Sequence, residues 1–504
     1  MTSTAPIKPL FAVLAVFAIA PLTMADELGI FAGAGDVGAV RNAGRIAYDA
    51  GRQIYVLEGS GANMWFDEDE FFFVWKKIDG DFILSADVAF DGEGVAPHRK
   101  LGLMIRESLE PDARYVDVAR HGDGLVSLQY RQHQGGDTAE LQSAVTQADM
   151  LRLERDGDRY VMSVARRGET LTATEFSDIE LPDEVYVGLF ICAHDADEVA
   201  QGRFGNVRIT VPVPDDFEPY QDYYASRLEI MDVATGHRRV VHTQPDSMQA
   251  PNWTVDGRAL IYNRNGLLYR FEIETGEVSR IDTGFATRNN NDHALSFDGR
   301  WLGISHHADD HDGNSMIYTL PATGGTPQLV TRRGPSYFHG WSPDGKWLTF
   351  TGGRDGDWDI YKIRADGSED EIRLTDDPAL DDGSEFSPDG EYIYFNSARS
   401  GRMQIWRMRP DGSGQEQVSD DAFNNWFPHV SPDGEKLVWL AYPPDIDPAD
   451  HPWYRRVYLM MKPVAGGDAR VLAALYGGQG TINVPSWSPD SRFIAFVSNT
   501  AVLE

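Results

Sequence analysis

The hydrophobic pattern of the first half of the chain alternates with a period of two residues. The alternation is clearest over residues 81–90, where one face carries Phe82, Leu84, Ala86, Val88 and Phe90. Similar runs occur at 101–106, 115–119, 126–130, 150–154 and 160–164, and turn residues at 122–124 and 156–158 separate two pairs of them. Many short strands with one apolar face indicate two packed sheets, so we expect a β-sandwich over residues 29–210.

The second half has a longer period. The tetrapeptide Ser-Pro-Asp-Gly, or a near copy, occurs six times at intervals of 42 to 57 residues, at 254–257, 296–299, 342–345, 387–390, 431–434 and 488–491. One apolar strand precedes each copy and another follows it. A period in the forties with turn residues between apolar runs is typical of a β-propeller, and six copies predict six blades over residues 223–504.

The two ends of the repeat region are incomplete in complementary ways. Residues 227–231 and 238–241 read as the outer two strands of a blade, and the last copy of the repeat supplies only the inner two. We expect these two pairs to complete one blade, which would close the ring without exposed sheet edges.

Longer motifs add two family resemblances. In the first half, Gly80-Asp-Phe-Ile-Leu, His98-Arg-Lys-Leu-Gly-Leu-Met-Ile-Arg106 and Gly202-Arg-Phe-Gly-Asn-Val-Arg208 resemble concanavalin-like (laminin-G-like) jelly rolls. Such domains often bind glycans, although many are spacers. The Trp-Ser-Pro-Asp-Gly repeats resemble the TolB-like six-bladed propellers. This second resemblance implies the fold rather than an activity, because propellers host binding modules and enzymes alike.

Composition and the first residues bear on partners and location. Asp and Glu number 78 against 45 Lys and Arg, and the net charge of −33 disfavours a nucleic-acid partner. An apolar run at 10–20 follows a single charge at Lys8 and precedes small residues at Thr23 and Ala25. We therefore expect a signal peptide over residues 1–25, cleaved after Ala25, a periplasmic or secreted protein, and no stable membrane span after cleavage.

Two further features concern the organisation of the chain. The Pro-rich, acidic stretch 211–222 reads as a linker between the sandwich and the propeller. The single cysteine, Cys192, makes no internal disulfide and lies in an apolar run typical of a buried strand.

The candidate chemistry lies where the inner strands of the blades begin, since these strands line the channel of such propellers. Four residues at these positions are candidate acid–base groups: His293, His339, His429 and Glu385. A loop on the same rim adds His306 and His307, which together with His293 and His339 are candidate ligands for a divalent metal, manganese or calcium. No other cofactor is indicated.

Six residues are candidate contacts for a substrate or ligand. Arg354 and Arg399 would hold a carboxylate, Asn252 and Trp453 would contact the ligand at the rim, and Arg99 and Arg106 belong to a locally basic set in the first half. Each residue also has a structural interpretation. A histidine near a channel often bonds only to a neighbouring blade, and arginines at strand ends are often solvated.

These observations leave three functions open. The first is an exported binding protein of the cell envelope that contacts a glycan or an envelope protein through the propeller rim. The second is a metal-assisted lyase or hydrolase acting on an acidic oligosaccharide in the channel, by analogy of fold with the manganese-binding oligogalacturonate lyases. The third is a structural subunit with a flat apolar patch. Serine-hydrolase elbows and nucleotide-binding loops are absent from the sequence.

Overall fold

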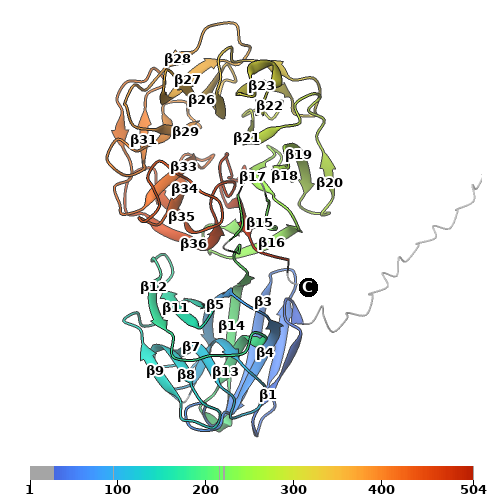
Figure 1. Ribbon diagram of the computed structural model, residues 1–504, viewed down its shortest axis with the longest axis vertical. Coiled ribbons are helices and arrows are strands. Elements are labelled where there is room, and N and C mark those ends of the chain that lie inside the picture. Colours follow the sequence, from blue (N-terminus) through green and yellow to red (C-terminus); the bar gives the residue numbers. More distant parts are fainter. Residues whose placement is uncertain (1–27, 95, 215, 220–221, 503–504) are drawn as a thin grey trace, which may run out of the picture.

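The computed structural model describes residues 28–94, 96–214, 216–219 and 222–502 and shows an all-β protein with nearly no helix (Figure 1). The predicted signal peptide lies outside the described residues. In the described part of the chain, no helix has the length and apolar character needed to cross a bilayer.

Two seven-stranded antiparallel sheets build the N-terminal part. The first sheet has the order β1-β4-β13-β6-β7-β8-β9 and the second β12-β11-β10-β5-β14-β3-β2. Strands of the first are β1 (Gly33–Val37), β4 (Phe71–Ile78), β6 (Lys100–Arg106), β7 (Tyr115–His121), β8 (Val126–Arg131), β9 (Ala139–Gln142) and β13 (Val185–Cys192). Strands of the second are β2 (Arg45–Asp49), β3 (Ile54–Gly61), β5 (Phe82–Asp91), β10 (Met150–Asp156), β11 (Arg159–Ala165), β12 (Thr172–Phe176) and β14 (Asp195–Thr210).

Alternating apolar residues of both sheets form one shared core. Leu84 and Leu153 come from the second sheet, and Leu103, Val118 and Leu189 come from the first, all of them fully buried. The period-two pattern in the sequence therefore places one face of each strand in this core.

The repeats form a six-bladed propeller, as predicted. Five blades are four-stranded sheets. They are built from β17 (Gln249–Trp253), β18 (Ala259–Arg264), β19 (Leu267–Glu272) and β20 (Val278–Arg280); from β21 (Asn289–Leu295), β22 (Trp301–His307), β23 (Ser315–Pro321) and β24 (Gln328–Leu329), with the 3₁₀ turn η1 (Asp309–His311); from β25 (Ser336–Trp341), β26 (Trp347–Arg354), β27 (Asp357–Arg364) and β28 (Ile372–Arg373); from β29 (Asp381–Phe386), β30 (Ile393–Ser397), β31 (Gln404–Met408) and β32 (Glu416–Gln417); and from β33 (Asn424–Val430), β34 (Lys436–Tyr442), β35 (Arg455–Pro463) and β36 (Arg470–Gly477).

The sixth blade joins segments that are far apart in the sequence. Its sheet has the order β16-β15-β37, with β15 (Ser226–Asp232), β16 (Arg238–Gln244) and β37 (Phe493–Asn499). Strands β15 and β37 pair antiparallel, and a bridge between Trp487 and Ile494 adds the innermost position.

The innermost strand of a blade contains a bulge that matters for the channel. In β29, Asp382 faces Asn396 but Glu385 faces Tyr394, so three steps on β29 match two on β30. Register shifts also interrupt β17, β21, β25 and β33. Gly383, at the bulge of β29, has φ +65°, and a Cβ there would lie 2.3 Å from Asn396 Oδ1. A bulge breaks the alternation of side chains between the two faces of a strand. The residues that face the channel before the bulge therefore cannot be found by counting back in steps of two from those after it.

The second N-terminal sheet region lies beside the propeller (Figure 1). Gln53 donates from Nε2 to the Val240 carbonyl at 2.9 Å and accepts the Val240 N–H at 2.9 Å. Asn206 accepts the backbone N–H of Arg238 at 2.8 Å. These bonds between side chains and backbone hold β14 and the residue before β3 against β16.

Candidate functional site

The propeller channel contains a cavity of about 950 Å³. Its walls come from the starts of the inner strands and from the loops on the same rim. Amide side chains are the commonest lining groups, joined by imidazoles, two carboxylates and aromatic rings: Asn289, Asn290, Asn291, Gln479, Asn483, His307, His339, His451, Asp292, Asp382, Tyr337, Trp358, Phe427 and Trp453. The cavity lining therefore combines amide and ionisable groups with apolar ring surfaces.

Asp382 is the centre of a hydrogen-bonded cluster on this wall. Its Oδ1 accepts from His339 Nε2 at 2.9 Å, from Thr351 Oγ1 at 2.6 Å and from the Gly383 N–H at 2.7 Å. His339 and Thr351 belong to the neighbouring blade, so the cluster joins two blades. Burial alone would raise the pKa of Asp382, but His339 and the hydrogen bonds lower it to about 2.

The pKa of His339 is correspondingly shifted in favour of the cation. Burial opposes the charged form, but the attraction of the Asp382 carboxylate and its hydrogen bond outweigh burial and raise the pKa of His339. The side chain is 4% exposed, so this ion pair is shielded from salt.

The pKa of a second carboxyl group on the same wall is shifted in the opposite direction to that of Asp382. Burial raises the pKa of Asp292 to about 6, although nearby His339 favours its charged form. Asn290 donates from Nδ2 to Asp292 Oδ2 at 2.5 Å. The wall thus combines one ionised and one readily protonated carboxyl group, a pairing found where proton transfer or polar recognition occurs.

The long loop between β34 and β35 reaches this cluster. It brings His451 to the cavity, with Nε2 3.9 Å from Asp382 Oδ2. The His451 ring packs edge-on against Trp426 at 4.5 Å and against Phe427 at 5.5 Å between ring centroids. Trp453 from the same loop also lines the cavity.

The structure separates the four predicted acid–base residues. Only His339 lines the cavity. His293 is fully buried, its Nε2 lies 3.3 Å from the Ile261 carbonyl, and burial lowers its pKa to about 4. His429 lies between Glu385 Oε2, 2.5 Å from its Nδ1, and the Ile482 carbonyl, which its Nε2 contacts.

The predicted anion-binding arginines already have carboxylate partners. Arg354 binds both oxygens of Glu371 at 2.7 and 2.8 Å and is buried. Arg399 donates to Asp381 Oδ2 at 2.6 Å. In the structure, both guanidinium groups stabilise their own blade.

The remaining predicted residues contact other parts of the protein. Asn252 ties blades together, donating to the Pro485 carbonyl at 2.7 Å and accepting the Leu295 N–H at 3.0 Å. Arg106 is buried against Asp69 at 3.0 Å, and Arg99 lies over the Phe90 ring at 4.3 Å.

Both loop histidines contact backbone groups of the propeller. His306 is buried and its Nδ1 accepts the Arg288 N–H at 3.3 Å. His307 lines the cavity, and its Nδ1 lies 3.2 Å from the Gly313 carbonyl. Within the described residues, no three histidine, cysteine, aspartate or glutamate side chains are grouped as metal ligands.

The sequence interpretation missed Asp382, Asp292 and His451. A signal for the first two existed, since polar runs at 289–292 and 381–382 begin the inner strands of their blades. The bulge hid it, because counting back from the Asp-Gly turn assumes an unbroken register.

A ring of six sheets around an open polar channel defines a six-bladed β-propeller with a cavity at its centre. Residues 338–501 match the family model described as TolB beta propeller domain. An uncharacterized protein of Agrobacterium fabrum is 48% identical over 274 residues, which are 54% of this chain and 92% of that protein. The chain belongs to the TolB-like β-propeller family.

One solved structure of high sequence identity agrees with this assignment. A structure from Agrobacterium tumefaciens, described as a TolB, shares 47% identity and a TM-score of 0.53, covering 55% of this chain and 99% of its own. TolB from Acinetobacter baumannii is similar at 19% identity and a TM-score of 0.40, over 51% of this chain and 65% of its own. These relatives account for little more than half of the chain.

Proposed function

We propose that the protein is an exported binding protein of the cell envelope, and that its propeller channel takes a neutral glycan. The observation that carries this proposal is the open cavity of about 950 Å³, in which amide side chains alternate with aromatic rings. A cavity of this size accommodates a small oligosaccharide.

The start of β21 supplies polar groups suited to sugar hydroxyls. Asn291 is buried, and its Nδ2 makes no hydrogen bond within the described residues; the same holds for Asn289 Oδ1. An amide donates and accepts, as a hydroxyl does, so an Asn-rich wall matches a sugar without requiring charge. A buried amide atom without a partner also gains most from a bound ligand.

Aromatic rings supply the apolar part of the site. Tyr337 and Trp358 lie with ring centroids 5.9 Å apart on the cavity wall, and Trp358 is 37% exposed. Exposed rings of this kind offer a flat apolar surface to the C–H face of a sugar ring.

Charge favours a neutral glycan over an acidic one. Asp382 is ionised on the cavity wall, while Arg354 and Arg399 are engaged by Glu371 and Asp381. The charge of Asp382 is paired with that of His339, so these groups offer an anionic sugar no uncompensated positive charge. The lyase alternative, which needs such a clamp for an acidic substrate, gains no support from this geometry.

The cellular location and the N-terminal part complete the proposal. The predicted signal peptide over residues 1–25 and the net charge of −33 support export to the periplasm. We assign the two N-terminal sheets to the concanavalin-like jelly rolls, and we regard an envelope protein as the other candidate occupant of the rim.

Calorimetric titration of the mature protein with neutral oligosaccharides tests this function. Trp358→Ala is expected to weaken binding at least about tenfold, because stacking rings are common hot spots. Trp301→Ala is the matched control: it removes another exposed tryptophan (43%) at the start of β22, next to an Asp-Gly turn, and should bind normally. Absence of glycan binding, together with a protein partner whose capture requires Trp358, would replace the glycan by an envelope protein.

A further inference from the structure

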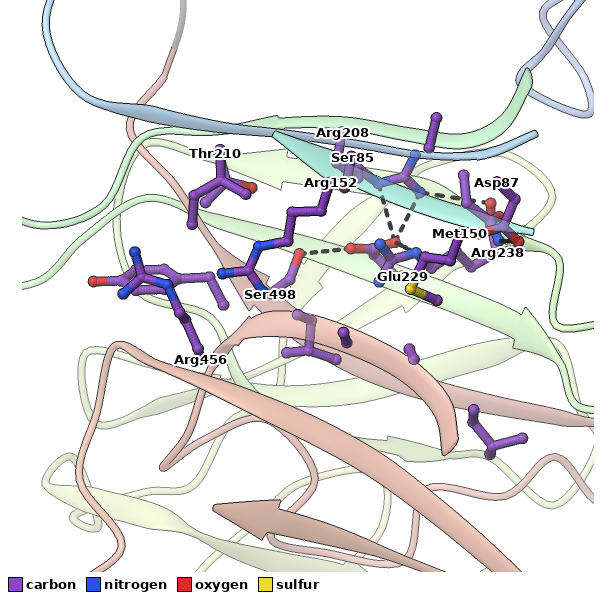
Figure 2. A pocket seen from close by; sticks show the side chains of 18 of the residues that line it. Ser85, Asp87, Met150, Arg152, Arg208, Thr210, Glu229, Arg238, Arg456 and Ser498 are labelled. Atoms are coloured by element: carbon purple, nitrogen blue, oxygen red, sulfur yellow. Dashed lines mark hydrogen bonds and ion pairs between the residues drawn. The ribbon is translucent and has the colours of Figure 1, made fainter. Parts of the chain in front are cut away.

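A second cavity, of about 40 Å³, lies in the seam between the N-terminal sheets and the propeller. Strands β5, β10 and β14 form one side, and β15, β16, β35, β36 and β37 form the other. Five arginines line it: Arg152, Arg208, Arg227, Arg238 and Arg456. Figure 2 shows Arg208 above Glu229, with Arg152 on one side and Arg238 on the other.

The central carboxylate is fully engaged. Glu229 Oε2 accepts from Arg208 Nη2 at 2.7 Å and lies 3.7 Å from Arg238 Nε, while its Oε1 accepts from Ser498 at 2.5 Å. Burial would raise the pKa of Glu229, but Arg208 and Arg238 lower it to about 2. One ionised carboxylate thus serves two of the five guanidinium groups.

The other carboxylates near the seam are also engaged. Glu154 binds both Arg152 and Arg456, with Arg456 Nε at 2.9 Å. Asp87 accepts from Asn206 at 2.8 Å and lies 3.7 Å from Arg167, which is half-exposed and outside the cavity. Three carboxylates therefore face five arginines of the cavity and one more at its edge.

Arg227 shows how the excess positive charge is held. It donates to the Ile209 carbonyl at 2.5 Å and to Thr210 Oγ1 at 3.4 Å, which are neutral acceptors. Burial, together with neighbouring Arg208, lowers the pKa of Arg227 to about 10. The guanidinium group of Arg227 therefore donates to neutral acceptors within a low-dielectric seam.

Two guanidinium nitrogens mark where a counter-ion would be held. Arg152 Nε and Arg238 Nη1 are buried and make no hydrogen bond within the described residues. Both residues are more than nine-tenths buried, and the side chain of Arg238 is 8% exposed. A buried cationic donor without an acceptor is costly, and an anion satisfies both its charge and its hydrogen bond.

We propose that this seam binds a monovalent inorganic anion of the size of chloride, and that the anion fastens the N-terminal sheets to the propeller. A water-sized particle needs about 10–15 Å³ of cavity volume, so 40 Å³ holds a chloride with a water but not a phosphate or a ligand carboxylate with its carbon chain. A water alone would supply an acceptor but no negative charge. The site is separate from the propeller channel and does not depend on the glycan.

Thermal unfolding in mixtures of sodium chloride and sodium gluconate at constant ionic strength tests the proposal. A ligand that binds only the folded state raises the unfolding midpoint with its concentration, here by about 2 °C for each tenfold increase in chloride above saturation. Arg238→Gln should abolish this dependence. Arg167→Gln, which removes a cation at the edge of the same seam without lining the cavity, should retain it.

Bromide provides a test that needs no variant. Crystals of the full protein grown in sodium bromide should show an anomalous peak in the cavity, within hydrogen-bonding distance of Arg152 Nε or Arg238 Nη1. A midpoint equally insensitive to chloride in all three proteins, or water in place of the bromide peak, would overturn the proposal.

Discussion

The two rims of the propeller differ in whether their polar networks repeat from blade to blade. On the turn rim, every blade contains the same small network, in which a Ser or Thr hydroxyl donates to the aspartate two residues later at 2.5 to 2.7 Å. On the channel rim, the inner strands carry different groups from blade to blade: Asp382 forms an ion pair, Asp292 is bonded to an amide, and Phe427 packs on His451.

The turn rim is stabilised by bonds within one turn, whereas the channel rim is stabilised by bonds between blades. Each turn satisfies its polar groups within a few residues, so one sequence solution can be copied six times. Asp382 depends on His339 and Thr351 of the next blade, and such a cluster exists only once the ring has formed. Repeated polar networks in this fold therefore specify structure, whereas unrepeated ones couple blades and shape the cavity.

The largest predicted effect comes from breaking the channel cluster with Asp382→Asn. Removing one partner of a buried ion pair leaves the other charge uncompensated, so we expect the free energy of unfolding to fall by about 3–5 kcal/mol. Urea denaturation at pH 5.5 measures this loss. The exposed Asp370, whose side chain is 92% accessible, gives the control variant Asp370→Asn, which should change stability by less than about 0.5 kcal/mol.

The same variant carries a pH signature. The depressed pKa of Asp382 contributes stability that is present above its unfolded value of about 3.8 and is lost as pH falls toward about 2. The raised pKa of His339 contributes stability that is present below about 6.5 and is lost as pH rises through the folded value. The penalty of Asp382→Asn should therefore be greatest between about pH 4 and 6.5, and a penalty unchanged at pH 2 would contradict the ion pair.

A smaller effect of opposite sign is expected for Asp292→Asn. The folded pKa of Asp292, about 6, exceeds its unfolded value, so the ionised carboxylate costs stability that accumulates as pH rises through this range. We expect the variant to be more stable than the parent by about 1–3 kcal/mol at pH 8 and equal to it at pH 3. Urea denaturation at the two pH values measures the difference. A variant that is equally stabilised at both would show that the gain has another origin.

The fold was more predictable from the sequence than the site, for a physical reason. The Asp-Gly turns and the alternating strands are local patterns, and they predicted the all-β propeller and its six blades. The channel wall depends on the inner-strand bulges, which add one or more residues between the turn and the cavity. Counting along the chain therefore identified His339 but not Asp382, its partner in the next blade.

Charge partners were equally hidden from the sequence. Sequence position made Arg354 and Arg399 candidates for an anion clamp, but their carboxylates, Glu371 and Asp381, are 17 and 18 residues away in the same blade. The arginine seam is less local still, since it joins Arg152 and Arg208 to Glu229 and Ser498 across the two parts of the chain. Spacing alone does not reveal such pairs, because tertiary packing creates them.

The smallest predicted effect sharpens the comparison between the rims. Ser342 and Ser387 occupy equivalent turns; each donates to its aspartate at 2.6 Å and accepts the N–H of the fifth following residue, at 2.9 and 3.0 Å. Since the two networks are alike and self-contained, Ser342→Ala and Ser387→Ala should each lower the free energy of unfolding by about 1 kcal/mol, and the double variant by the sum within about 0.5 kcal/mol. Urea denaturation of the three variants beside Asp370→Asn measures this.

On the channel rim, the double variant Asp382→Asn with Thr351→Val should instead lose less stability than the sum of the two single losses, because both changes remove bonds of one cluster. If the stability losses add on the channel rim, or if those of the two turns do not add, the two rims do not differ in whether they are stabilised within a turn or between blades.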